Sequence, residues 1–482
     1  MAEKTLKEKT THGLLWGGIN NVAQQGLGLV FGIILGRLLS PHDYGMVPMI
    51  LVFQLIAGAL QESGFKSALC NLKEPQHGDY NAVFWFNIIV GTLCYVLLFF
   101  ASPLIAAYYH TPELVLLCRV SFLSIILSSL GIAQSAFLFK NLKVKEQAKC
   151  NITATVISSL VGVTLAFLGC GYWALAIQSM AYIGINSLLL WHFSSWRPKL
   201  EWDFQPVKAM FRFSCKMLAT RILDIVNTNV MNILLGRYYT TTEVGNYNQA
   251  YQWNYKVSYL LQGTLNQVAQ PVFSRVDEER ERQLHILRKL IRFTAFLSFP
   301  MLLGFSLVAE EFIVLAIGEK WLTSAHLLQL LCISGAFIPL SSVLTNLLIS
   351  KGRSGTYFWC TLALCVLLIS TMLLLYPYGI RSMVMAYVVI YILWTFVWHF
   401  FVRRLTGYSL WAFLLDTLPF ALTALAVMAV TWIATRSITS LPLLLLSRIA
   451  MAAVLYFIVM KLLRVRIFQE TVAFLQSWSI SE

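Results

Sequence analysis

Two charged residues of opposite sign stand three positions apart in an otherwise apolar stretch of the sequence. Arg221 and Asp224 lie near the middle of residues 210–236, followed by Asn227 and Thr228. Arg221, Asp224 and Thr228 share one helical face, because residues three, four and seven apart are neighbours on a helix. A guanidinium beside amides can bind an anion, and a carboxylate can bind a proton or a cation. We predict that this face lines a polar cavity, with an interhelical hydrogen-bond network as the alternative.

The next apolar stretch carries a cation among aromatic and amide residues. Lys256 lies near the middle of residues 246–270, close to Tyr251 and Tyr255. An ammonium group in such surroundings suits an anion or a sugar. Pairing of Lys256 with an internal carboxylate such as Asp224 is the alternative, and the sequence does not decide between the two.

Polar side chains recur 200 positions upstream, in residues 13–36. Asn20, Gln24 and Gln25 lie there, and Gln24 is the counterpart of Asp224 at that offset. We therefore predict that both polar faces contribute to substrate binding. Asp224 and Glu62 are the candidates for coupling transport to an ion, because a carboxylate inside a membrane can titrate.

The composition indicates that these residues lie within a membrane protein. Of the 482 residues, 58% are hydrophobic and only 12% are charged, whereas about 25% are charged in an average soluble domain. We count about 14 apolar segments near the ~20 residues needed to span a bilayer. The expected fold is an all-α polytopic membrane protein.

The distribution of basic residues predicts the topology. With the N-terminus in the cytoplasm, most of the 36 Lys and Arg residues fall in cytoplasmic loops or beside them, as the positive-inside rule requires. Both termini are then cytoplasmic. The net charge of +14 follows from this topology, so it does not indicate a nucleic-acid partner.

One motif, L-G-R-x-x-[ST]-x-x-[DE]-x-G, occurs at residues 35–45 and again at 235–245. Each copy joins two apolar segments and carries an N-cap residue followed by an acidic residue three positions later. The 200 residues between the two copies span six predicted helices. We therefore predict that the chain consists of two parallel repeats, which have the same orientation in the membrane. We predict an N-lobe of six helices over 1–205, a C-lobe of six helices over 206–404, and a two-helix appendage with a cytoplasmic tail over 405–482.

Other charged residues inside the apolar segments are expected to be structural, namely Arg119, Asp416 and Arg448. The nine cysteines and eight histidines show no metal-ligand spacing. No phosphate-binding glycine loop is present. The sequence therefore predicts neither a metal nor a cofactor.

The chain resembles the polysaccharide transporters of the multidrug/oligosaccharidyl-lipid/polysaccharide (MOP) superfamily, in particular the Wzx-type, colanic-acid exporter-like flippases. The resemblance covers nearly the whole chain, and its motifs are structural corners, specific for the family and weak for the substrate. They lie at Lys7 to Thr10, Leu39 to Gly45, Asn227 to Arg237, Val244 to Tyr251 and Phe312 to Trp321.

The resemblance implies that the protein moves undecaprenyl-diphosphate-linked oligosaccharides across a bacterial inner membrane by alternating access. It also implies a central cavity whose cations hold the diphosphate, and here only Arg221 and Lys256 are available. Membrane lipids and a polysaccharide polymerase or glycosyltransferase are the expected partners. The resemblance therefore implies a transporter and not an enzyme.

Three other functions compete with this one. A cation-coupled multidrug exporter of the same superfamily would need an acidic cavity, whereas the bases here at least equal the acids. A membrane-embedded polymerase or glycosyltransferase would need a large outer loop or a carboxylate motif at a membrane face, and neither is visible. A lipid II flippase matches the motifs less well.

Overall fold

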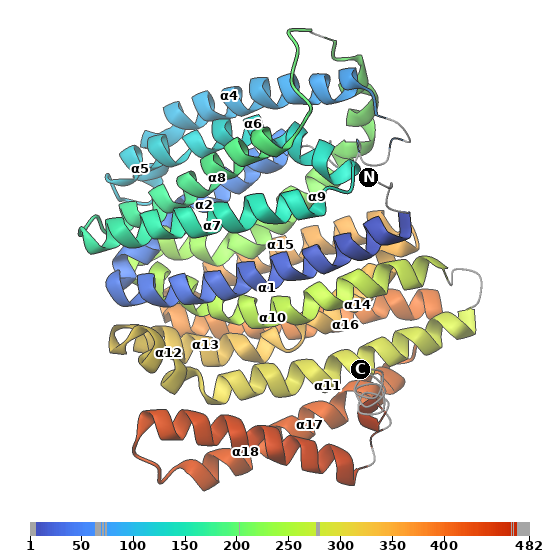
Figure 1. Cartoon of the computed structure of the whole chain (residues 1–482). Helices are drawn as coiled ribbons and strands as arrows, with labels where there is room; N and C mark the ends of the chain where they lie inside the picture. Colours follow the sequence, from blue (N-terminus) through green and yellow to red (C-terminus); the bar gives the residue numbers. More distant parts are fainter. Residues whose placement is uncertain are drawn as a thin grey trace. The chain divides into compact units, whose positions relative to one another are not determined.

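The apolar segments form long helices in the computed structural model (Figure 1). The structure describes residues 6–62, 69, 72, 75–201, 203–275, 280–463, 465 and 467–469. Within these ranges there is no β-strand. Most of the predicted cytoplasmic tail lies outside the described residues.

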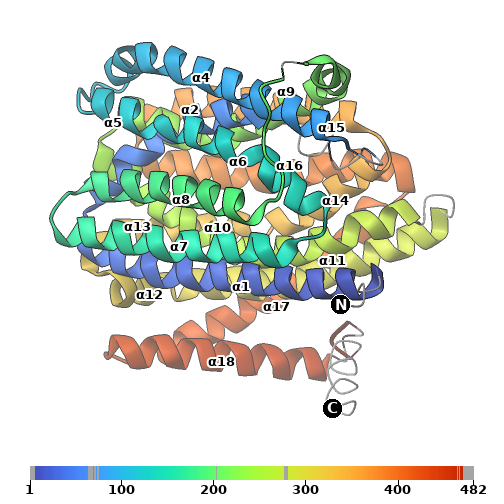
Figure 2. The ribbon, with the colours of Figure 1, turned by 45° about the horizontal axis from the view of Figure 1, so that its top comes forward.

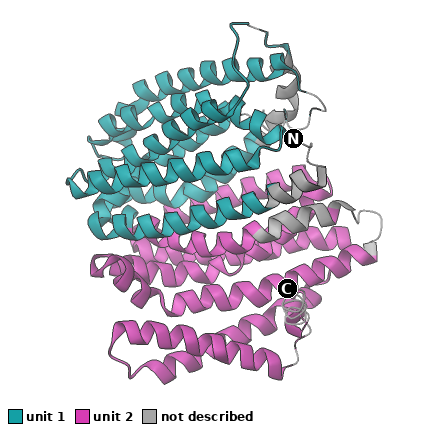
Figure 3. Ribbon diagram, viewed as in Figure 1, with its two compact units in different colours: residues 1–245 teal, residues 246–482 magenta. Residues whose placement is uncertain are grey.

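The chain divides into two compact units, residues 1–245 and 246–482 (Figure 3). The predicted lobe boundaries near residues 205 and 404 stay predictions. The helices of unit 1 are α1 (Leu6–Leu38), α2 (Pro41–Glu62), α4 (His77–Tyr108), α5 (Leu114–Ser121), α6 (Leu123–Lys140), α7 (Val144–Phe167), α8 (Tyr172–Phe193) and α9 (Gln205–Tyr238).

Unit 2 contains most of α10, whose first five residues belong to unit 1. Its helices are α10 (Thr241–Arg275), α11 (Arg280–Leu307), α12 (Ala309–Ile317), α13 (Leu322–Gly335), α14 (Ile338–Ser350), α15 (Ser354–Leu375), α16 (Ile380–Thr406), α17 (Leu410–Thr435) and α18 (Leu441–Leu462). Two 3₁₀ turns, Glu319–Trp321 and Tyr376–Tyr378, join consecutive helices.

In the described part of the chain, 12 helices are long and apolar enough to cross a membrane. Helices α9 and α10, of 34 and 35 residues, are as long but are not among them. Together these helices are consistent with the predicted number of about 14. The prediction of an all-α, multi-pass membrane protein is confirmed.

Two of the apolar segments, each long enough to span a membrane as one helix, are broken. The segment over 114–137 forms α5 and α6, and the segment over 323–349 forms α13 and α14. They are the fourth and tenth long helices of the chain, so each is the fourth helix of its predicted six-helix repeat. The junction between α5 and α6 contains neither glycine nor proline, whereas Pro339 stands in the first turn of α14, a position where proline is typical of a new helix. Broken helices are tolerated at membrane depth only where the protein shields the freed backbone groups.

Helices α1, α7 and α8 of unit 1 form a packed layer. Helix α7 lies along α8 on one side and along α1 on the other, in both views (Figures 1 and 2). A reversal at Gly169 and Gly171, both with positive φ, joins α7 to α8. Glycine is the residue that adopts this conformation without strain, so the two glycines permit a short hairpin between the helices.

Both copies of the repeated motif form the predicted capped corners. Ser40 N–H donates to the Asp43 carboxylate at 2.9 Å, and Asp43 N–H donates to the Ser40 hydroxyl at 3.2 Å. Thr240 and Glu243 repeat this reciprocal arrangement at 3.1 and 3.3 Å. Each pair satisfies backbone donors that the start of a helix leaves free.

The two corners contact each other within unit 1. A Cβ atom on Gly45 would lie 1.8 Å from the Thr241 carbonyl oxygen, and one on Gly245 would lie 1.8 Å from the Pro41 carbonyl oxygen. The contact is therefore reciprocal, as expected for two copies of one motif. Only glycine permits this approach, because any side chain would overlap the opposite backbone.

Arg237 of the second corner binds a neighbouring turn. Its guanidinium donates to the Tyr108 carbonyl at the end of α4 and contacts His110. Tyr109, in the same turn, packs its ring against Gly236. Burial raises the pKa of Tyr109 above its usual value, so the phenol stays neutral. Arg237 thus joins the corner to α4 and anchors it there.

Buried charges fix α17 against α11 inside unit 2. Asp416 is 1% exposed and accepts hydrogen bonds from Arg288 at 2.8 Å and from Arg292 at 2.5 Å. Tyr408 donates to the same carboxylate at 2.8 Å. Burial, reinforced by this bond, raises the pKa of Tyr408. A buried charge needs such compensation in a low-dielectric environment, so Asp416 has the expected structural role.

Arg448 of α18 has a similar role. It is buried, pairs with Glu311 of α12 and donates to the Leu307 carbonyl at 3.2 Å. In unit 1, Arg119 donates to Ser102 at 3.2 Å. All three residues predicted to be structural are thus engaged by neighbouring helices.

We predict that Gly245→Ala destabilises the folded protein. The added methyl group would overlap the Pro41 carbonyl, and overpacking costs roughly 1–3 kcal/mol. Fluorescence-detected size-exclusion chromatography after heating should show a lower midpoint for Gly245→Ala. Gly26→Ala is the matched control, because nothing lies within 4 Å of a Cβ atom there. Equal midpoints for the two variants would contradict the prediction.

Candidate functional site

The polar residues of α9 divide between an open and a buried side of the helix. Arg221 and Thr228 are exposed and Asp224 is half-buried, whereas Asn227 and Asn229 are buried. The predicted stripe of Arg221, Asp224 and Thr228 therefore lies on the accessible side. A helix that exposes such groups requires water or protein beside it, since hydrocarbon solvates neither charges nor hydroxyls.

Two side chains of this helix satisfy their hydrogen bonds locally. Thr228 donates to the Asp224 carbonyl at 2.7 Å, and Asn229 donates to the Ile225 carbonyl at 2.9 Å. Bonds to the carbonyl four residues earlier are common for polar residues within helices. The charged groups of Arg221 and Asp224 remain the chemically distinctive part of this face.

The polar residues of α1 lie against or near α7. Thr155 of α7 donates to Gln24 at 2.8 Å, so Gln24 makes the interhelical bond that the alternative prediction described. Asn20 and Gln25 are half-buried on the same helix. The Asn20 Oδ1 and Gln24 Nε2 atoms have no hydrogen-bond partner among the described residues, which leaves polar capacity on this helix.

Lys256 of α10 lies over an aromatic ring. Its Nζ atom is 4.3 Å from the centroid of Trp253, a cation–π geometry. Trp253 in turn packs edge-on against Phe312 at 4.9 Å. Among the described residues of unit 2, no carboxylate forms an ion pair with Lys256. Pairing with Asp224, a residue of unit 1, stays a prediction.

Four tyrosines follow one another along α10 at intervals of four residues: Tyr247, Tyr251, Tyr255 and Tyr259. Consecutive ring centroids are 6.1, 6.3 and 5.5 Å apart, with interplanar angles of 27°, 17° and 30°. We call this row the tyrosine ladder. Sequence reasoning noted several of these aromatic residues but missed their spacing, although the repeat of four was readable.

A cavity of about 290 Å³ lies inside unit 1, between α2, α6 and α8. Its polar lining includes Gln54 and Gln61, two turns apart on α2. Gln54 donates to the Ser121 carbonyl at 3.0 Å, at the break between α5 and α6. Sequence reasoning missed Gln54, although its seven-residue spacing from Gln61 was a signal. Glu62 is exposed at the end of this helix.

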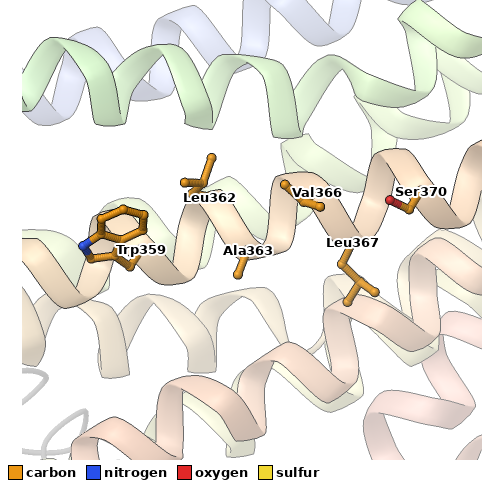
Figure 4. Close-up of a pocket in the computed structure, with 6 residues that line it drawn as sticks. All are labelled: Trp359, Leu362, Ala363, Val366, Leu367 and Ser370. Atoms are coloured by element: carbon orange, nitrogen blue, oxygen red, sulfur yellow. The ribbon is translucent and has the colours of Figure 1, made fainter.

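A second, shallower pocket of about 480 Å³ lies on α15 of unit 2 (Figure 4). Its lining contains no charged residue. The residues that line it are Trp359, Leu362, Ala363, Val366, Leu367 and Ser370. Such a surface suits hydrocarbon chains of the bilayer and not an anionic headgroup.

Known proteins match this chain over most of its length. A family model described as "Polysaccharide biosynthesis protein" matches residues 34–326. The lipopolysaccharide biosynthesis protein WzxC of Escherichia coli K12 is 28% identical over 360 residues, which are 73% of this chain and 72% of WzxC. The teichuronic acid biosynthesis protein TuaB of Bacillus subtilis 168 is 25% identical, with 74% of each chain covered.

Solved structures share the fold. The lipid II flippase MurJ, in an inward closed conformation, matches with a TM-score of 0.74 and 15% identity, covering 93% of this chain and 99% of MurJ. An inward-facing multidrug resistance transporter of the MATE family, in the MOP superfamily, matches with a TM-score of 0.65 and 14% identity. That match covers 80% of this chain and 94% of the transporter. Both comparisons bear on the fold alone.

We predict that the open side of α9 contacts water. In a chain whose native cysteines are replaced, Thr228→Cys should react with a membrane-impermeant maleimide in cells or inverted vesicles. Asn229→Cys, one position away on the buried side, is the matched control and should stay unlabelled. Labelling of Thr228→Cys by membrane-permeant reagents alone would place this side against lipid and contradict the prediction.

Proposed function

The chain belongs to the polysaccharide biosynthesis protein family, and from this premise we propose that it flips lipid-linked oligosaccharides across the bacterial inner membrane. The substrate is a sugar repeat unit carried on undecaprenyl diphosphate. WzxC and TuaB are named for the biosynthesis of two cell-surface polymers, and a 26% identical relative, ExoT of Rhizobium meliloti, is named as a succinoglycan biosynthesis transport protein.

One observation of the structure supports this function most directly. Helices α9 and α10 are long enough to cross a membrane but carry charged, amide and phenolic side chains on accessible sides. A lipid-linked oligosaccharide needs such surfaces for its headgroup, while its lipid chain needs only hydrocarbon. The contrast between these two helices and the 12 apolar ones matches the two-part chemistry of that substrate.

Arg221 and Lys256 are the residues that we assign to the diphosphate. Arginine binds phosphate oxygens through two parallel hydrogen bonds, and lysine binds them as a point charge. Amides at Asn20, Gln24 and Gln25 are assigned to sugar hydroxyls. Asn227, also predicted to bind substrate, is buried in this conformation, so its assignment requires that transport expose it. An inside-negative membrane potential favours outward movement of negative charge by ~2.3 kcal/mol per charge per 100 mV.

The proposed activity is transport by alternating access, with no covalent change to the substrate. Both termini then lie in the cytoplasm, by the distribution of Lys and Arg. A polymerase or glycosyltransferase that supplies or consumes the repeat unit is the proposed partner. A multidrug exporter for cationic compounds fits less well, because Arg221 and Lys256, near the middle of α9 and α10, at least balance the carboxylate of Asp224.

We predict that Arg221→Ala and Lys256→Ala each lower export by roughly tenfold, the effect of losing about 1.4 kcal/mol of headgroup binding. The measurement is surface polysaccharide in a strain that depends on this chain, normalised to protein in the membrane. Arg436→Ala and Lys461→Ala, at exposed positions near helix ends, are the matched controls. Normal polysaccharide from both test variants would refute the assignment.

We also propose that Asp224 or Glu62 couples flipping to an inward ion gradient. In vesicles, an imposed proton or sodium gradient should accelerate flipping by the unmodified chain. Asp224→Asn or Glu62→Gln should remove that acceleration, whereas Glu113→Gln, at an exposed position after α4, should retain it. A flipping rate that responds to neither gradient would exclude ion coupling.

A further inference from the structure

The tyrosine ladder is buried at one end of α10 and exposed farther along the helix. Tyr247 is 1% exposed, whereas Tyr255 and Tyr259 are 45% and 40% exposed. Tyr251, the next residue of the ladder, is half-buried. The ladder is therefore held by protein at one end and open at the other.

The open rungs do not fit a lipid-facing surface. Gln252 is exposed and Lys256 is half-buried, on the turns that carry Tyr255 and Tyr259. An amide and an ammonium group are costly in hydrocarbon. Nor do the open rungs form a packing surface, because a packed ring would be buried as Tyr247 is. Rings that remain accessible beside polar groups are suited to a ligand that is partly apolar and partly polar.

The ladder extends along a large part of α10. Twelve residues separate Tyr247 from Tyr259, which corresponds to about 18 Å of helix at 1.5 Å per residue. This is more than half of the ~30 Å hydrocarbon core. Its rungs are chemically identical and nearly evenly spaced. Only Tyr255 and Tyr259 are exposed, and the four residues between them correspond to about 6 Å of helix, which suits one or two sugar rings.

Uncharged sugar rings have the chemistry that such a row recognises. One face of a pyranose presents C–H groups, which pack against the electron-rich face of an aromatic ring. Its hydroxyl groups point outward, where phenols and amides can bond them. A charged headgroup gains less from phenol rings than from Arg or Lys. The ladder therefore suits the glycan part of a lipid-linked oligosaccharide and not its diphosphate.

We propose that the tyrosine ladder of α10 is a binding track for the uncharged glycan of the substrate, with Tyr255 and Tyr259 as its open rungs. This inference rests on the proposed flippase function and adds a specific subsite to it. The ring faces bind the sugars, and the hydroxyl groups of the tyrosines are secondary. Removing the rings should therefore impair export, whereas removing only the hydroxyl groups should not.

The test compares Tyr255→Leu/Tyr259→Leu with Tyr255→Phe/Tyr259→Phe, in the full chain and in a strain whose surface polysaccharide depends on it. We expect the leucine pair to lower export about tenfold, the effect of losing two aromatic contacts. The phenylalanine pair, which keeps both rings, should stay within about twofold of the unmodified chain. If the leucine pair fails to accumulate in the membrane, the single variants Tyr255→Leu and Tyr259→Leu replace it.

The outcomes separate this inference from the function on which it rests. Normal export by the leucine variants at normal abundance, with export by the unmodified chain intact, would overturn the ladder and leave the flippase function standing. Equal loss in the leucine and phenylalanine pairs would also overturn it, because hydroxyl groups and not ring faces would then matter. Failure of the unmodified chain to restore polysaccharide would refute the flippase function itself.

Discussion

The membrane imposes one constraint on which the rest of this structure depends: polar side chains on a spanning helix must be shielded from hydrocarbon. Twelve long spans of the described residues meet it largely by being apolar, with single polar groups such as Gln24 bonded to a neighbouring helix, whereas α9 and α10 are more polar. Their charged, amide and phenolic groups exclude a lipid environment for those sides. The functional proposals follow from this contrast, because a polar surface within the membrane is useful only to a ligand that is itself polar.

The charges of the chain meet the constraint in two different ways. In α17 and α18, Asp416 and Arg448 are buried and held by partners of opposite charge, which fixes these helices to the rest of unit 2. Arg221 is instead exposed, and Lys256 lies over a tryptophan ring. A guanidinium on an open face, or an ammonium stabilised by an aromatic ring, can still accept an anion. Position in the fold thus distinguishes the charges that stabilise unit 2 from the two charges that we propose bind the substrate.

The repeated corner shows how a duplicated motif acquires a joint role. Each copy alone is a capped turn between two helices, and its cap residues serve that turn. In the folded chain, Gly45 and Gly245 also lie at the contact between the two copies. Because neither residue has a Cβ atom, the two backbones can approach each other closely. The glycine that ends the motif is thus required by the contact between copies and not by the turn itself. Arg237 extends the same corner to the end of α4.

The sequence by itself determined the membrane class, the positions of the long helices, the capped corners and the polar character of α9 and α10. These properties are local, because hydropathy and capping act over one helix or one turn. Only the tertiary structure decided which side of each helix is open, as it separated Thr228 from Asn229 and buried Tyr247 while leaving Tyr255 accessible. It also revealed the break after Ser121 and the cavity beside Gln54. Such features depend on contacts between residues far apart in the chain, which periodicity along a single helix does not encode.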